Sequence, residues 1–190
     1  MTYGKPSPAE YQVRELSRLI LAFEDIDFAI NGVKAFLETV EDRELREQCR
    51  DTKQHLFHSS VISYCKMFIA SRGGRGVIRI RDLPTLGLPE CRAIHDSIVA
   101  LRNECVAHND AEKNLTFVGW DQKQQLHFPQ RLRKMYWSME EAQKVWALMS
   151  CVNRDIIANI YRIFAELELH AGRMYKIDAN GLQEVTGGMS

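Results

Sequence analysis

The stretch that decides the fold is SMEEAQKVWALMSCVNRDIIANIYRIFAEL, residues 138–167. Its first residue, Ser138, can cap a helix, and Glu141 stands three residues later, where it completes a capping box. Apolar side chains then recur every three or four residues, as they do on one face of a helix. They are Val145, Leu148, Val152, Ile156, Ile160, Ile163 and Leu167. The stretch therefore predicts one long amphipathic helix.

Helical periodicity also dominates the chain before this stretch. Ser7-Pro8-Ala9-Glu10 starts a first helix, and its apolar run is open to interruption at Asp25-Ile26-Asp27 and at Gly32. Two further helices are predicted over about 42–71 and about 89–107 from the spacing of their apolar residues.

Short β segments and irregular stretches complete the prediction. A loop with a short strand at 77–80 joins the two middle helices, residues 115–120 and 125–128 form a small hairpin, and the Gly-rich tail 177–190 is flexible. We therefore predict an all-α fold in a single domain over residues 1–190. It is an antiparallel bundle of four to five main helices with a small β-hairpin insertion.

The composition is that of a globular domain without an overall charge. Of the 190 residues, 45% are hydrophobic and 26% are charged, and 25 basic residues balance 25 acidic ones. Binding to nucleic acid would therefore need a local basic patch. The five cysteines lack zinc-finger spacing, which favours reduced thiols. With no apolar run of about 18 residues and no signal-peptide pattern, we expect a cytoplasmic protein with no membrane partner.

The residues that carry chemistry lie in Leu101-Arg102-Asn103-Glu104-Cys105-Val106-Ala107-His108-Asn109-Asp110. They join a permanent cation, a side chain that titrates near neutral pH and a polar amide, which together can hold a phosphodiester and move protons around it. On a regular helix, Arg102 and His108 would lie about 120° apart around the axis. Either the helix unwinds near Ala107, as Asn109-Asp110 favours, or the two residues meet through a second protomer.

This stretch resembles the HEPN superfamily, whose motif is an arginine, usually followed by a polar residue, and then a histidine after four to six intervening residues near a helix end. Arg102, Asn103 and His108 match that pattern. The fuller string Arg-Asn-x-x-x-Ala-His-x-Asp is similar to HEPN proteins grouped with abortive-infection defence systems. The motif itself covers seven residues, and the all-helical context extends the resemblance over most of the chain.

The resemblance implies a metal-independent endoribonuclease that needs no cofactor. It implies a homodimer whose two motifs line one cleft, RNA as substrate, and a phage-defence or toxin setting with an antitoxin or defence-system partner. His108 would move the proton, Arg102 would clamp the phosphate, and Asn103 would orient His108 or donate to a phosphate oxygen. Asp110 is a supporting candidate that could hold the His108 tautomer.

Other roles for the same residues stay open at this point. An arginine and a histidine near a helix C-terminus interact favourably with its dipole without any catalytic role. HEPN-type modules that bind a nucleotide, RNA or a protein without cleavage are the main alternative function. A purely structural helical adaptor would need neither Arg102 nor His108 to be exposed.

Several side chains outside the motif could serve RNA binding or have purely structural roles. Four arginines of the predicted loop could contact RNA phosphates or simply be solvated: Arg72, Arg75, Arg79 and Arg81. We expect His95 on a solvated helix face, and His55 and His58 at the surface or the edge of the core rather than on a metal. Trp137 is expected to pack at the start of the last helix rather than to stack on a base.

Overall fold

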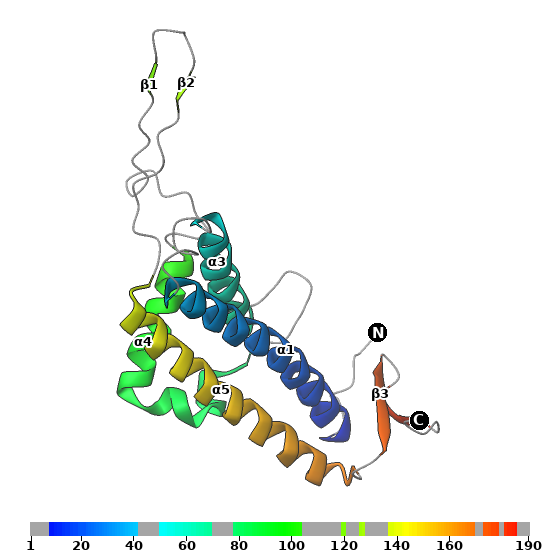
Figure 1. Cartoon of the computed structure of the whole chain (residues 1–190). Helices are drawn as coiled ribbons and strands as arrows, with labels where there is room; N and C mark the ends of the chain where they lie inside the picture. Colours follow the sequence, from blue (N-terminus) through cyan, green and yellow to red (C-terminus); the bar gives the residue numbers. More distant parts are fainter. Residues whose placement is uncertain are drawn as a thin grey trace, which may run out of the picture.

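The computed structural model describes residues 8–41, 50–69, 78–103, 119–120, 126–127, 137–169, 173–178 and 181–185. Within these ranges the fold is mainly helical (Figure 1). The α-helices are α1 (Pro8–Glu41), α3 (Arg50–Lys66), α4 (Pro89–Leu101) and α5 (Met139–Glu166). Two 3₁₀ turns, η1 (Ile80–Asp82) and η2 (Pro84–Gly87), lead into α4. The prediction of a helical bundle with a small β-hairpin is confirmed at this level.

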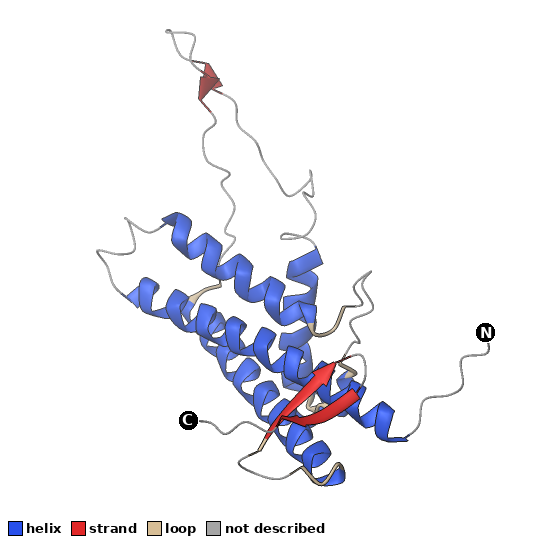
Figure 2. Cartoon of the chain, turned by 90° about the vertical axis from the view of Figure 1, so that its right-hand side faces the viewer, coloured by secondary structure: helices blue, strands red, loops and turns tan. Residues whose placement is uncertain are grey.

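Helix α1 is the centre of the bundle. It packs along α3 on one side and along α5 on the other, while α4 contacts α3 and α5 (Figures 1 and 2). The largest side chains that the bundle fully buries are aromatic and branched aliphatic. They include Leu16, Ile26, Phe36, Phe57, Tyr64, Ile98, Met149, Ile156 and Ile163. This burial of apolar stripes on facing helices supplies most of the stabilisation of the fold.

The start of α5 forms as the sequence predicts. Ser138 Oγ accepts a hydrogen bond from the Glu141 backbone N–H at 3.2 Å, and a Glu141 carboxylate oxygen accepts one from the Ser138 N–H at 2.7 Å. Trp137, just before the cap, packs its ring edge-on against Phe57 at 4.8 Å and Phe36 at 6.5 Å. The capping box and the packing of Trp137 are both confirmed, and together they fix where the last helix begins.

The expected interruption of the first helix is absent, because α1 runs without a break from Pro8 to Glu41. Gly32 has a packing role instead. A Cβ at this position would lie 2.3 Å from Ser60 Oγ, so the missing side chain lets α3 approach α1 closely. Ser60 is fully buried, and its hydroxyl donates to the Leu56 carbonyl at 2.7 Å. The glycine thus marks a helix crossing, not a helix end.

The first of the two middle helices ends earlier than the periodicity predicted. Helix α3 ends at Lys66 rather than near residue 71, because the Phe68 N–H bonds to the Cys65 carbonyl and the Met67 carbonyl accepts the Ile78 N–H at 2.9 Å. The strand predicted at 77–80 is wrong over its described residues. Ile78 is bonded to Met67 just after α3 and not to a strand, and Ile80 is the first residue of η1. Helix α4 is an α-helix to Leu101 and continues as a π-helical turn at residues 102–103, and the rest of the helix predicted to about 107 lies outside the described residues.

Two antiparallel hairpins accompany the helices. The first pairs β1 (Gly119–Trp120) with β2 (Leu126–His127), which confirms the predicted insertion, and it stands apart from the helices (Figure 1). The second pairs β3 (Met174–Asp178) with β4 (Gly181–Val185) beside the end of α5 (Figure 2). The tail 177–190 was predicted to be flexible, so the second hairpin was missed.

No helix in the described ranges is long and apolar enough to cross a membrane.

The crossing at Gly32 leads to a prediction about stability. Gly32→Ala should destabilise the protein by about 1 kcal/mol. The added methyl group displaces the buried Ser60 hydroxyl, and this loss exceeds the roughly 1 kcal/mol that alanine gains over glycine in a helix. In a Ser60→Ala background the same substitution should become stabilising, since the clashing oxygen is gone. Urea unfolding of the four members of this double-mutant cycle measures the sign change. An equal effect of Gly32→Ala in both backgrounds would contradict the assigned contact.

Candidate functional site

Arg102 and Asn103 lie together where α4 ends. The Arg102 backbone is still helical, with φ −60° and ψ −46°, and its N–H points to the carbonyls of both Ile98 and Val99. The chain then widens into a π-helical turn at residues 102–103. Such turns interrupt α-helices mostly as short pieces and are frequent at functional sites. The change of helix type therefore coincides with the arginine of the sequence motif.

The two side chains are directly connected. Arg102 Nη1 donates to Asn103 Oδ1 at 3.0 Å, with Arg102 half-buried and Asn103 exposed. Among the described residues, Arg102 has no carboxylate partner, whereas four other arginines have one within 4.0 Å. Those four are Arg81, Arg92, Arg162 and Arg173. The amide orients Arg102 without neutralising its charge, so the guanidinium keeps its positive charge for an anion.

The remaining motif residues, His108 and Asp110, lie outside the described residues. The meeting of Arg102 with His108, in one chain or across two, therefore stays a prediction. Arg72 and Arg75 of the predicted RNA-binding loop also lie outside the described ranges.

A buried polar pair holds α4 against α3. Tyr64 and His95 are both buried, and the Tyr64 hydroxyl lies 2.9 Å from His95 Nδ1. The His95 ring also packs edge-on against Phe68 at 4.6 Å. The solvated helix face predicted for His95 is therefore wrong. Burial lowers the pKa of His95, while Asp96 raises it and Arg92 lowers it by smaller amounts. The lowered pKa favours the neutral imidazole that the hydroxyl can bond.

Cys65, which no sequence pattern connects to the motif, supports the last turn of α4. Its thiol is buried and lies 3.9 Å from the Ile98 carbonyl oxygen, the same oxygen that accepts from the Arg102 N–H. Burial raises the pKa of Cys65 to about 12, and the positive charge of Arg102 opposes this rise. The thiol therefore stays protonated and serves as a weak structural donor rather than a nucleophile.

Helix α5 fixes the segment that leads into α4. Asp155 accepts a hydrogen bond from the Thr85 N–H at 2.7 Å, and Asn159, one turn later, donates to the Asp82 carbonyl at 2.9 Å. These two side chains satisfy backbone groups at the ends of η1 and η2, where helical turns leave N–H and carbonyl groups without an internal partner. The direction in which α4 leaves the loop is thus set by polar contacts from α5.

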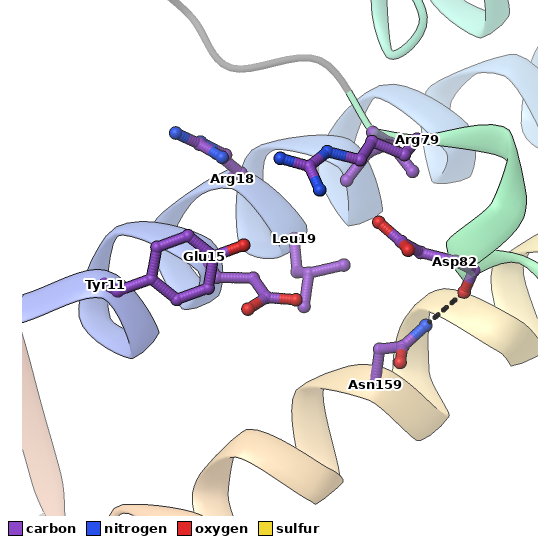
Figure 3. Close-up of a pocket in the computed structure, with 8 residues that line it drawn as sticks. Tyr11, Glu15, Arg18, Leu19, Arg79, Asp82 and Asn159 are labelled. Atoms are coloured by element: carbon purple, nitrogen blue, oxygen red, sulfur yellow. Dashed lines mark hydrogen bonds between the residues drawn. The ribbon is translucent and has the colours of Figure 1, made fainter. Parts of the chain in front are cut away.

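The loop arginines that the structure describes lie at a different place. Arg79 faces Arg18, with the carboxylates of Glu15 and Asp82 close by, in a crevice between α1, the loop and α5 (Figure 3). The crevice holds about 20 Å³, enough for one water molecule. Arg81 is exposed and lies 3.8 Å from Asp82. Neither arginine contacts Arg102 within the described residues, so the structure does not join them into one site.

The other candidate histidines lie on α3. His55 is exposed, while His58 is half-buried at the edge of the core beside the Phe57 ring. Burial, helped by the nearby His55, lowers the pKa of His58. Within the described part of the chain, no three side chains of histidine, cysteine, aspartate or glutamate gather in a way that could hold a metal ion.

Comparison of the chain with protein-family models, with curated proteins and with solved structures finds no match.

The buried pair predicts the effect of removing one hydroxyl. Tyr64→Phe should lower the free energy of unfolding by about 1–2 kcal/mol, because it leaves His95 Nδ1 buried without its partner. Tyr161→Phe is the matched control: Tyr161 is 67% exposed, and its loss should change stability by less than about 0.5 kcal/mol. Denaturant unfolding of both variants measures the difference. Equal stabilities of the two variants would show that the Tyr64–His95 bond contributes nothing.

The lowered pKa of His95 predicts a dependence of stability on pH. Its ordinary value is 6.5, so in the folded state the imidazole resists protonation that the unfolded chain accepts below about pH 6.5. The unfolded state then binds more protons, and the free energy of unfolding falls as the pH is lowered through this window. His95→Gln should make this fall less steep, while the part of the fall that comes from His58, whose pKa burial also lowers, should remain. Urea titrations between pH 5.5 and 7.5 test this, and an unchanged slope in His95→Gln would refute it.

Proposed function

We propose that the protein is a metal-independent endoribonuclease of the HEPN type, acting at a site built around Arg102, Asn103 and His108. The observation that carries the proposal is the pairing of Arg102 with Asn103 at the end of α4. The guanidinium is half-exposed, oriented by a neutral amide and without a carboxylate partner in the described part of the chain. Such a group can receive a phosphate oxygen through its remaining N–H donors.

The proposed chemistry needs only side chains and the substrate. A base removes the proton of the ribose 2′-hydroxyl, and the oxygen then forms a bond to the adjacent phosphorus. The bond from phosphorus to the 5′-oxygen breaks, and that oxygen takes up a proton. The products are a 2′,3′-cyclic phosphate and a 5′-hydroxyl. His108 moves the protons, because an imidazole exchanges them near neutral pH. Arg102 stabilises the extra negative charge on the phosphorane oxygens.

A second copy of the chain is part of the proposal. Arg102 and His108 would be about 120° apart on a regular helix, so a single straight helix does not direct both at one phosphate. The π-helical turn at residues 102–103 changes the rotation of the chain around the helix axis. Even so, one chain would still have to bring its own arginine and histidine to the same phosphate. Two motifs facing each other across a symmetric interface would instead supply an arginine from one protomer and a histidine from the other. Cytoplasmic action on RNA in a defence or toxin–antitoxin setting belongs to the same proposal.

The decisive experiment is an RNA cleavage comparison. With single-stranded RNA in excess EDTA, the wild type should generate 2′,3′-cyclic phosphate ends. His108→Ala and Arg102→Ala should each reduce the rate by about 100-fold or more, since proton transfer and charge stabilisation each contribute that much. His55→Ala, which removes an exposed histidine from α3, is the matched control and should cleave normally. Circular dichroism of each variant confirms that a loss of activity is not a loss of fold.

Two results would overturn the nuclease proposal. Cleavage by His108→Ala at the wild-type rate would place the activity elsewhere. An inactive wild type that still binds RNA, with binding lost in Arg102→Ala, would favour the alternative of a non-catalytic HEPN-type module. The exposed Asn103 beside Arg102 suits that alternative as well, because an amide and a guanidinium can bind a phosphate without cleaving it.

A further inference from the structure

We infer that the protein holds a single RNA strand at a second place, along the crevice between α1, η1 and α5, with Arg18 and Arg79 as its phosphate-binding residues. Arg18 belongs to α1, and Arg79 immediately precedes η1 (Figure 3). Of the described residues, those that line the crevice include neither Arg102 nor Asn103. The inference deepens the proposed function, because it rests on RNA as the substrate and adds a second contact with it.

Two arginines face each other at this crevice, and neither has a carboxylate partner. Figure 3 shows the Arg79 side chain directed toward Arg18. In the part of the chain that the structure describes, neither guanidinium forms an ion pair or donates a hydrogen bond. Arg79 is exposed and Arg18 is half-buried. Two like charges at short range repel each other, and an anion bound by both removes that repulsion and gains two charge-assisted contacts.

The carboxylates of the crevice are engaged elsewhere. Glu15 lies 3.4 Å from Arg162, and Asp82 lies 3.8 Å from Arg81. Arg162 has a second partner in Glu166, at 2.6 Å. Together with the facing pair, four arginines therefore stand against three carboxylates around the crevice. In a chain whose 25 basic and 25 acidic residues balance, this local excess of positive charge favours an anionic ligand.

The shape of the crevice favours a phosphate within a strand over an enclosed small anion. Its volume of about 20 Å³ holds no more than one water molecule, so a phosphate lies on the rim and not inside. A ligand held only at a rim keeps most of its surface in water and gains little from one contact. A strand compensates for this, because it makes several such contacts along its length.

Tyr11 indicates that the strand is single. It lines the same crevice from α1, about 10 Å along the helix axis from Arg18, and it is 45% exposed. Its ring contacts no other ring among the described residues. An exposed aromatic ring beside phosphate-binding arginines is the arrangement that binds single strands, because an unpaired base can stack on the ring while the backbone follows the charges. The paired bases of a duplex are not free to do so.

Fluorescence anisotropy tests the inference, with the full chain and a short single-stranded RNA whose 2′-hydroxyls are methylated, so that the proposed chemistry cannot cleave it. Arg18→Gln and Arg79→Gln should each weaken binding by about three- to tenfold. Each should also lower the slope of log affinity against log salt by about 0.7, the value for one phosphate contact on a single strand. Tyr11→Ala should weaken binding about fivefold or more at an unchanged salt slope, since stacking displaces no counterions.

Arg154→Gln is the matched control, because it removes one exposed arginine from α5 outside the crevice. It should bind with the affinity and the salt slope of the wild type. A loss in Arg154→Gln equal to that in Arg79→Gln would overturn the inference, because it would reflect net charge alone. Wild-type binding by both crevice variants, or a wild type that binds no RNA, would overturn it as well. Displacement of the strand by an equal concentration of inorganic phosphate would assign the arginines to a free anion and so overturn the strand.

Failure of this inference and failure of the nuclease proposal give different results. Normal binding by Arg18→Gln and Arg79→Gln, together with cleavage that depends on His108, would remove the second contact and keep the nuclease. A wild type that cleaves no RNA, but whose RNA binding depends on Arg18 and Arg79, would remove the nuclease and keep the second contact.

Discussion

One buried hydrogen bond, between Tyr64 and His95, couples α4 to the rest of the bundle. Helix α1 is held to its neighbours over long apolar seams, but α4 meets α3 and α5 over short contacts. A polar pair inside such a contact must be satisfied, because a buried donor or acceptor without a partner is costly. The bond therefore allows few orientations of α4 relative to α3. The C-terminal end of α4, where Arg102 lies, is therefore restricted in its position as well.

Arg102 illustrates this dependence. The Ile98 carbonyl that accepts its backbone N–H also lies against the Cys65 thiol, so the last turn of α4 is fixed from α3. At the other end of α4, Asp155 and Asn159 hold the 3₁₀ turns that precede it. The position of Arg102 thus rests on polar contacts from two other helices. Apolar packing alone would let α4 rotate or slide, and the guanidinium would move with it.

The sequence predicted the parts of the fold that local rules determine. The Ser138 capping box and the stripe from Val145 to Ile163 depend only on residues near each other in the chain, and both were predicted correctly. Gly32 was misjudged, because its role depends on Ser60 of another helix. His95 was misjudged although it stands between Cys91 and Ile98 on the apolar stripe of α4, since a histidine there was expected to face water. The second hairpin had a local signal in the sequence that was not used: the pair Asn180-Gly181, which is typical of hairpin turns, stands where β4 begins at Gly181.

Charge distribution distinguishes the candidate site from most of the rest of the described surface. The chain carries 25 basic and 25 acidic residues, and several described arginines pair with a neighbouring carboxylate. The opposite charges of such a pair cancel at a distance, so the pair does not attract an anion that is farther away than the Debye length. Arg102 differs because its partner is the neutral Asn103, so its charge is not cancelled. In a symmetric dimer, two such arginines would add their fields at one cleft. A protein without net charge would then attract a polyanion at that cleft.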